Sequence, residues 1–290
     1  FDLTPFSKFE IKSDKAHQEL QKICTANIKN EPGKCVYTHM LNPDGGIETD
    51  LTVVCVDKNY FRIISSAATR ERDKFHIKKH LSKNIELEDV TDDLCVFGLF
   101  GPKSRDLLKI VSKDNFENDQ FKFGFAKFIS IDGVKIWAQR LSYVGELGFE
   151  LYIDLKNAKR IYELLIEKGK DLNLSNCGMH AMDIMRMESG FVHWGHDISP
   201  EENQFQAGLS FTISSKKEVD FIGKQALKKI KQEKQKSRFT MFTLKESEPG
   251  KPLLLHDEPI YDGEKIIGRS TSGNYSFNFK KNLVFGYINN

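Results

Sequence analysis

Asp50 is an acidic residue that follows shortly after a glycine-rich turn. The stretch 37–53 predicts a strand, a tight turn at Asp44-Gly45-Gly46 and a second strand, because an Asp-Gly pair between two extended runs is a strong hairpin signal. In the second strand Asp50 alternates with apolar residues and shares a face with Glu48 and Thr52. The pattern alone makes Asp50 a strand-borne carboxylate, and the usual exposure of Asp favours a solvated position at the rim of a sheet.

The stretch Tyr143–Glu150 (YVGELGFE) combines a tyrosine, two glycines and two acids on a turn that leads into a strand. Glycine permits a flat ligand to approach the backbone closely, and carboxylates accept hydrogen bonds from a heterocycle that carries several N–H groups. An ordinary glycine turn between two strands fits the same residues. The pattern does not choose between these interpretations.

Three further groups of polar or aromatic residues have a structural explanation beside a chemical one. Arg186 follows Asp183 at the i,i+3 spacing of a helical ion pair. Trp194 is either a stacking platform or a core residue. The motif His193-x-x-His196 has a spacing that suits a metal, but no third ligand stands at a recognised distance, so hydrogen bonds to the backbone are favoured and no metal site is expected.

Composition excludes several classes of function. The chain has 290 residues, 39% of them hydrophobic and 29% charged, with a net charge of +2, so charge indicates neither a nucleic-acid nor a membrane partner. No G-x-G-x-x-G or P-loop motif occurs, and no apolar run approaches the ~18 residues that span a bilayer. Five unpaired-looking cysteines favour a reducing compartment, the cytoplasm or, in a eukaryote, the mitochondrial matrix.

The elements that must position these residues follow from the apolar periodicity. Strands are predicted at 1–12, 51–56, 60–65, 94–100, 128–131, 134–143 and 149–153, and helices at 13–27, 69–81, after Gly101-Pro102, at 158–168 with Asn157 as its cap, and at 180–189. The helix over 69–81 is expected to be solvated. Strand, helix and hairpin recur in both halves, which indicates two related α+β units rather than a doubly wound sheet.

The C-terminal part has a different pattern. Residues 216–238 are rich in lysine with apolar residues at helical spacing, which predicts a surface helix; interleaved aromatic residues, which would favour nucleic acid, are missing. Short strands are then predicted at 239–244, 259–261, 265–269 and 283–288. The sequence therefore predicts one domain over 1–237 and a small all-β domain over 238–290, with the boundary near Ser237.

Six ordered segments together resemble the landmarks of the aminomethyltransferase (glycine-cleavage T-protein) superfamily, which binds tetrahydrofolate. They are NPDGGIETDL (42–51), FGLFGPKSR (97–105), YVGELGFELY (143–152), HAMDIMRMESG (180–190), HWGHDI (193–198) and DFIGKQAL (220–227). The opening DLTPFSKFEI and the HWGHD loop are similar to the folate-binding C-terminal half of dimethylglycine and sarcosine dehydrogenases. Met182 stands where glycine-cleavage members carry an arginine, which also favours the dehydrogenase branch.

The resemblance implies α+β subdomains around a central folate cavity and a small C-terminal antiparallel β-barrel. Asp50 matches the family's essential aspartate, Tyr37 and Tyr143 match aromatic positions that line the cavity, and Glu150 matches the glutamate that hydrogen-bonds the pterin. Trp194 and Arg186 complete the expected set of cofactor-binding residues. The chain begins at Phe1 and ends soon after a segment past which the family's barrel usually continues, so both ends are expected to be incomplete.

The resemblance further implies a one-carbon transfer. A flavin in an N-terminal half or a separate subunit would oxidise an N-methyl amine of the dimethylglycine or sarcosine type, and tetrahydrofolate would capture the carbon as 5,10-methylenetetrahydrofolate. FAD is expected only if such a flavin half exists outside this chain. Two alternatives remain open: a glycine-cleavage aminomethyltransferase or folate-dependent demethylase, and a folate-binding module without catalysis.

Overall fold

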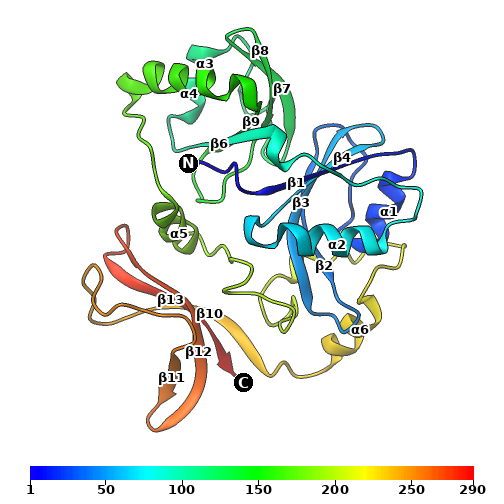
Figure 1. Cartoon of the computed structure of the whole chain (residues 1–290). Coiled ribbons are helices and arrows are strands. Elements are labelled where there is room, and N and C mark those ends of the chain that lie inside the picture. The colour runs from blue at the N-terminus through cyan, green and yellow to red at the C-terminus, as the bar shows by residue number, and fades with distance from the viewer. The chain divides into compact units, whose positions relative to one another are not determined.

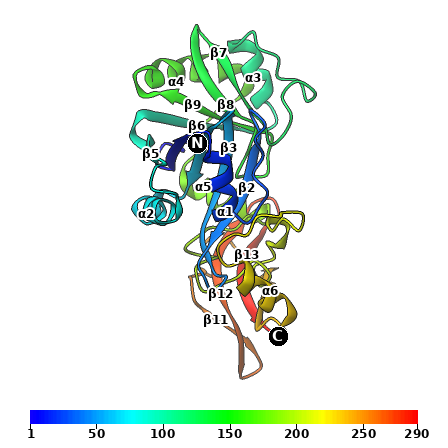
Figure 2. The same ribbon diagram turned by 90° about the vertical axis from the view of Figure 1, so that its right-hand side faces the viewer.

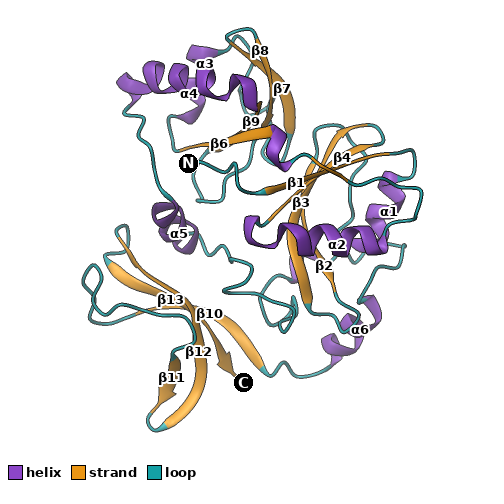
Figure 3. Ribbon diagram, viewed as in Figure 1, coloured by secondary structure: helices purple, strands orange, loops and turns teal.

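A computed structural model describes all 290 residues, and its strands form three sheets (Figures 1 and 3). Two compact units divide the chain, and neither is continuous in sequence. Unit 1 comprises Phe1–Leu20, Ile28–Tyr37 and Leu51–Met182, and unit 2 comprises Gln21–Asn27, Thr38–Asp50 and Asp183–Asn290. None of the helices is both long and apolar enough to cross a membrane.

The first sheet has the strand order β2-β3-β4-β1-β5. Its strands are β1 (Ser7–Lys12), β2 (Cys35–Leu41), β3 (Ile47–Asp57), β4 (Tyr60–Ser65) and β5 (Glu88–Asp89), and its helices are α1 (Ala16–Ile23) and α2 (Arg70–His80). Strand β4 pairs antiparallel with both β1 and β3. The predicted hairpin is confirmed as β2 and β3, and the division between the units runs through these two strands.

The second sheet lies entirely in unit 1, in the order β6-β9-β8-β7 (Figure 2). Its strands are β6 (Leu94–Phe100), β7 (Ala126–Ile131), β8 (Val134–Gln139) and β9 (Gly148–Asp154), with helices α3 (Ser104–Val111) and α4 (Leu155–Gly169). The two helices lie on one side of the sheet (Figure 3). Phe149, Leu151 and Ile153 belong to the hydrophobic core, so the alternate residues Glu150 and Tyr152 lie on the opposite face.

The third sheet belongs to unit 2 and is antiparallel, in the order β10-β13-β12-β11. Its strands are β10 (Ser237–Thr243), β11 (Pro259–Asp262), β12 (Lys265–Ser276) and β13 (Lys281–Asn289); α5 (Met179–Glu188) and α6 (Lys224–Gln232) precede it. Four 3₁₀ turns complete the structure: η1 (Ala67–Thr69), η2 (Thr91–Asp93), η3 (Lys170–Leu172) and η4 (Ser210–Thr212). The predicted α+β class is confirmed.

Several predicted boundaries were wrong for local reasons. Helix α4 begins at Leu155, ahead of the predicted cap Asn157, and no side chain caps it. The lysine-rich segment is helical only over α6, because Gly223 has a φ of 79° and cannot continue a right-handed helix. Helix α2 is not simply solvated, since Asp73 and Ile77 are buried.

Of the five cysteines, all free, four are buried and Cys177 is exposed.

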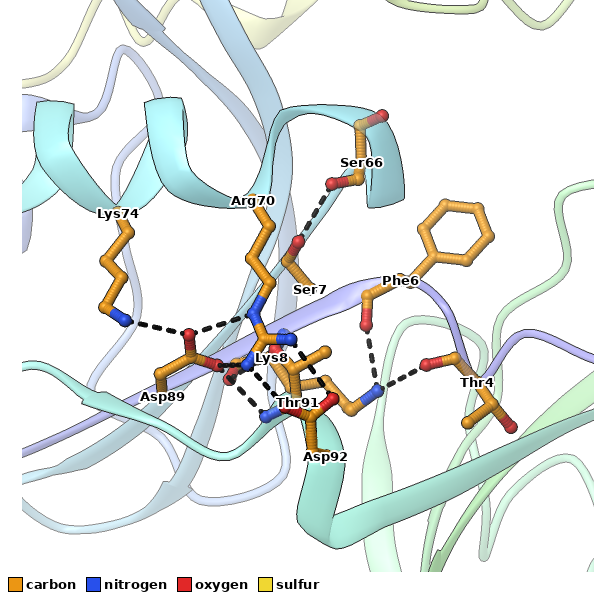
Figure 4. Close-up of polar contacts among 10 residues, drawn as sticks. All are labelled: Thr4, Phe6, Ser7, Lys8, Ser66, Arg70, Lys74, Asp89, Thr91 and Asp92. Atoms are coloured by element: carbon orange, nitrogen blue, oxygen red, sulfur yellow. Dashed lines mark hydrogen bonds and ion pairs between the residues drawn. The ribbon is translucent and has the colours of Figure 1, made fainter.

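A buried lysine holds the N-terminal segment of unit 1 (Figure 4). Lys8 of β1 is fully buried, and its Nζ donates to the carbonyl oxygens of Thr4 and Phe6, each at 2.8 Å. Its backbone N–H donates to Thr91 Oγ1 at 3.0 Å. Desolvation lowers the pKa of Lys8 to about 8. These hydrogen bonds satisfy a lysine that burial would otherwise penalise.

An ion-pair network ties α2 to the same region (Figure 4). Arg70 donates from Nε and Nη2 to the two carboxylate oxygens of Asp89, both at 3.0 Å, and reaches Asp92 at 2.9 Å. Lys74 also contacts Asp89, at 3.1 Å. Burial acts to raise the pKa of Asp89, but hydrogen bonds from Arg70, Thr91 and Lys74 outweigh it and hold that pKa well below its usual range.

We expect Asp89→Asn to lower the free energy of unfolding by about 1–2 kcal/mol, because it removes a bidentate charged hydrogen bond. The folded pKa lies below the unfolded one, so this stabilisation is present above pH ~4 and is lost as the pH falls further. Urea unfolding at pH 7 and pH 3 measures the difference. Asp92→Asn is the matched control, since Asp92 is exposed on the same arginine. Equal effects of both variants at pH 7 would contradict this account.

Candidate functional site

The tip of the β2–β3 hairpin is fixed by one asparagine and by close backbone packing in unit 2. Asn42 Oδ1 accepts from the backbone N–H groups of Asp44 at 3.0 Å and Gly46 at 2.9 Å. A Cβ on Gly46 would lie 1.8 Å from the carbonyl oxygen of Pro200, so only glycine fits. The next backbone N–H, of Ile47, donates to Glu202 O at 2.9 Å. The loop around residue 200 thus fixes the start of β3.

Asp50 lies on β3 in the alternation that the sequence predicts. Ile47, Thr49 and Leu51 are buried, whereas Glu48, Asp50 and Thr52 are half-buried. The shared face of these three polar residues is therefore confirmed. Asp50 is neither fully buried nor a fully solvated rim residue.

Glu150 on β9 is a carboxylate held in a desolvated position in unit 1. Tyr152, two residues further on the same face, donates from Oη to Glu150 Oε2 at 2.9 Å. Desolvation raises the pKa of Glu150 to about 7, although the hydrogen bond from Tyr152 opposes this shift. Part of the residue surface stays accessible. Near neutral pH this group therefore exchanges between carboxylate and carboxylic acid.

Three buried N–H groups without an acceptor belong to residues that neighbour this pair. In the register of β8 and β9, Gln139 lies opposite Glu150, and Trp137 lies opposite Tyr152. Gln139 Nε2, Trp137 Nε1 and Arg62 Nη1 are buried and make no hydrogen bond. The guanidinium carbon of Arg62 lies 5.5 Å from the centre of the Tyr152 ring. The face is thus rich in unpaired donors beside one acid, an arrangement that suits a ligand with both donors and acceptors.

Gln139 and Trp137 were missed by the sequence reasoning. Both alternate with the apolar residues Ile136 and Ala138 in β8, so the period of two places them together on the face opposite the core. That alternation was the available signal. Their pairing with β9, which makes them neighbours of Glu150, comes from tertiary structure.

The two tyrosines expected at the site also belong to unit 1. Tyr37 is on β2 with 37% of its surface exposed. Tyr143 is half-buried in the turn between β8 and β9, which leads directly to Glu150. Asp50, Arg186 and Trp194 belong to unit 2. The six expected residues therefore divide equally between the units.

Arg186 on α5 is fully engaged within unit 2. The predicted pair with Asp183 is confirmed, with Nε donating to Asp183 Oδ1 at 2.9 Å and Nη2 at 2.8 Å from the same oxygen. Nη1 donates to Asp197 Oδ2 at 2.5 Å and to Phe191 O at 3.0 Å, and Nη2 donates to Ser272 Oγ at 2.8 Å. These contacts use the five N–H groups of the guanidinium. These contacts fix the position of the guanidinium within unit 2.

Asp197 links that arginine to the third sheet. Its Oδ1 accepts from Thr271 Oγ1 at 2.5 Å and Ser272 Oγ at 2.7 Å, and its Oδ2 accepts from the backbone N–H of His193 at 2.9 Å. Both Arg186 and Asp197 are almost completely buried. Each charge therefore depends on its partners for the solvation that water would otherwise provide.

Trp194 connects the loop before this aspartate to the hairpin. Its Nε1 donates to Ile47 O at 3.1 Å, and its half-buried ring packs against a hydrophobic cluster that includes Leu41 and Ile47. The ring therefore supports the start of β3, the strand that carries Asp50. The nearby rings of His193 and His196 are 4.5 Å apart. No set of three or more potential ligand side chains in the structure is arranged to hold a metal ion.

The α+β fold thus carries an aspartate on the β2–β3 hairpin and a desolvated glutamate on β9. The chain belongs to the glycine-cleavage T-protein family: the GCVT N-terminal domain matches residues 1–217, and the glycine cleavage T-protein C-terminal barrel domain matches residues 238–290. The family predicted from the sequence is therefore confirmed.

Relatives of this chain include an oxidase, a dehydrogenase and an aminomethyltransferase, which differ in length. The chain is 36% identical to 4-methylaminobutanoate oxidase (formaldehyde-forming) of Paenarthrobacter nicotinovorans and 33% identical to mitochondrial dimethylglycine dehydrogenase of Homo sapiens, covering 95% and 99% of this chain but 33% of each relative. It is 32% identical to an aminomethyltransferase of Halothermothrix orenii, covering 99% of this chain and 79% of that protein. The chain thus spans about a third of the oxidase and the dehydrogenase.

A solved structure has the same fold. The glycine cleavage system aminomethyltransferase T from Bartonella henselae superposes with a TM-score of 0.88 at 20% identity, covering all of this chain and 77% of that one. At that identity the likeness establishes the fold alone. It confirms the T-protein-like α+β architecture predicted from the sequence.

We expect Gly46→Ala to destabilise the protein by about 1–3 kcal/mol, because the added methyl group cannot fit against Pro200 O without moving the hairpin tip. Thermal unfolding measures the loss. Gly178→Ala is the matched control, since a Cβ there has nothing within 4 Å. A Gly46 variant as stable as the control would show that the approach of Pro200 is not a constraint.

Proposed function

We propose that this chain binds tetrahydrofolate and transfers a one-carbon unit to it. The observation that carries the proposal is the desolvated Glu150 carboxylate beside unpaired buried donors, in a chain that belongs to the T-protein family. The relatives named as an oxidase, a dehydrogenase and an aminomethyltransferase are compatible with it. The enzyme class we propose is a tetrahydrofolate-dependent aminomethyltransferase-type transferase.

The residues of unit 1 fit the pterin ring of a reduced folate. A pterin presents an exocyclic amine and ring N–H groups on one edge, which a carboxylate such as Glu150 accepts. It also presents a carbonyl oxygen and an unprotonated ring nitrogen, which buried N–H donors beside Glu150 would satisfy. The half-buried Tyr143 would cover an aromatic face. A ligand with only acceptors would leave Glu150 without donors.

Tetrahydrofolate would supply a nucleophilic nitrogen that takes up the one-carbon unit and yields 5,10-methylenetetrahydrofolate. The residues of this chain would orient the folate and stabilise charge on the reacting atoms. Asp50, as a carboxylate on a restrained strand, would stabilise positive charge on the incoming carbon and accept a proton from nitrogen. We propose Glu150 as the contact of the pterin and Tyr37, Trp194 and Arg186 as further cofactor-binding residues, because the chain belongs to the T-protein family. Within unit 2, Arg186 also holds the loop that carries Trp194.

The donor of the carbon is part of the proposal. We propose an N-methyl amine of the dimethylglycine or sarcosine type, oxidised by a flavoprotein half or subunit, because the chain spans a third of the oxidase and dehydrogenase relatives. The domain organisation proposed with it is a folate-binding domain over 1–237 and a C-terminal domain over 238–290. The compartment proposed is a reducing one, cytoplasm or mitochondrial matrix, in line with the free thiols.

A second function is favoured by one observation. The aminomethyltransferase of Halothermothrix orenii matches along most of its own length, so a transferase of glycine cleavage, working without an amine-oxidising half, is the alternative. Formation of methylenetetrahydrofolate from an aminomethylated lipoyl carrier protein, and not from oxidised sarcosine, would support it over the first proposal.

Calorimetric titration with tetrahydrofolate under argon tests the binding step. We expect affinity to rise as the pH increases from 6 to 8, by up to about tenfold per unit below pH 7, because the carboxylate form of Glu150 accepts the pterin N–H groups. Glu150→Gln should bind about 10–100-fold more weakly at pH 8 and show a flat pH profile. Glu146→Gln, exposed in the same turn, is the control. Absence of binding by the folded wild-type chain would refute the proposal.

Asp50→Asn tests the transfer step. We expect tetrahydrofolate affinity to stay within a few-fold of wild type while the rate of methylenetetrahydrofolate formation from formaldehyde, above the protein-free background, falls by about 10²–10³. The loss follows from removing the charge and the proton acceptor while keeping the shape. Glu48→Gln, on the same face of β3, should retain the rate. Unaltered turnover in the Asp50 variant would exclude this aspartate as the catalytic carboxylate.

A further inference from the structure

Gln139 occupies an unusual position for a polar side chain. It is the last residue of β8, it is fully buried, and it lies directly opposite Glu150 on β9. Its Oε1 has one weak partner, the thiol of Cys35 with Sγ at 4.0 Å. Its Nε2 has none. Because a buried donor without an acceptor destabilises the fold, a residue of this kind needs a reason to be there.

A second buried glutamine shows what a structural role looks like in the same chain. Gln204 is also fully buried, but its Nε2 lies 2.6 Å from Thr212 Oγ1, 3.1 Å from Thr25 Oγ1 and 2.9 Å from His39 Nδ1. Its amide N–H groups are thereby used by the fold itself, and only its Oε1 lacks a partner. Gln139 differs in that its donor group is unpaired, and it lies beside a desolvated acid.

We propose that Gln139 is a ligand-binding residue that donates from Nε2 to the carbonyl oxygen of the pterin ring. This inference rests on the proposed function and assigns a new residue to the same site. The pterin carbonyl adjoins the ring N–H that a carboxylate binds, so a donor next to Glu150 meets it while the acid takes the amine and N–H edge. The glutamine thus selects a 4-oxo pterin, since the 4-amino group of a diaminopteridine presents hydrogens at that position.

A residue that serves ligand binding rather than the fold can be replaced without a loss of stability in the ligand-free protein. Gln139→Met keeps the length of the side chain and removes an unsatisfied donor, so the melting temperature of the ligand-free protein should be unchanged or higher. The Kd for tetrahydrofolate should rise about tenfold or more, as expected for one lost hydrogen bond in a buried site. Gln204→Met should do the opposite, with a lower melting temperature and a Kd within about twofold of wild type.

The experiment is differential scanning fluorimetry and anaerobic calorimetry with tetrahydrofolate on the wild type and both methionine variants of the full chain. A Gln139→Met protein that melts at or above the wild-type temperature and binds at least tenfold more weakly supports the assignment. Unchanged affinity, or a melting temperature lowered as far as in Gln204→Met, overturns it. If the wild type binds but Gln139→Met binds equally, only this inference fails; if the wild type does not bind, the proposed function fails with it.

Discussion

The removal of one carboxylate from water is the constraint on which the site in unit 1 depends. Glu150 faces away from the hydrophobic core because its neighbours Phe149 and Leu151 face into it. The strand therefore cannot bury its apolar residues without also placing the acid on the opposite face. There, Tyr152 supplies one hydrogen bond, and partial desolvation raises the pKa of the acid. The fold therefore supplies only part of the stabilisation that the charge of Glu150 would have in water.

Unit 2 also contains buried charges, but there the hydrogen bonds of the charged groups are complete. The Arg186–Asp197 pair is almost completely buried, yet every N–H of the guanidinium and both oxygens of the carboxylate have partners. A pair with complete hydrogen bonding fixes the backbone around it. Through His193 and Phe191 it fixes the loop that holds Trp194. Unit 1 thus contains buried polar groups without partners, whereas the buried ion pair of unit 2 has all of its partners.

Local rules predicted much of the fold and the placement of Asp50. The Asp-Gly turn and the period of two were enough to predict the β2–β3 hairpin and the face shared by Glu48, Asp50 and Thr52. The site around Glu150 could not be derived this way, because strand β8 must first pair with β9 before Gln139 lies opposite the acid. The full set of Arg186 partners includes Ser272, which no sequence spacing connects to α5. Predicted helix ends failed for local reasons, since α4 begins ahead of Asn157 and Gly223 has a positive φ.

The division between the units has a consequence for how the chain is made. Unit 2 consists of Gln21–Asn27, Thr38–Asp50 and Asp183–Asn290, so its first two segments leave the ribosome long before the third. Until then the hairpin tip lacks Pro200 and Glu202, the partners that fix the start of β3. Strand β3, which carries Asp50, therefore completes its contacts only after the segment around residue 200 has been synthesised and a long loop has closed. Contacts of such long range slow folding and leave apolar surface exposed during synthesis.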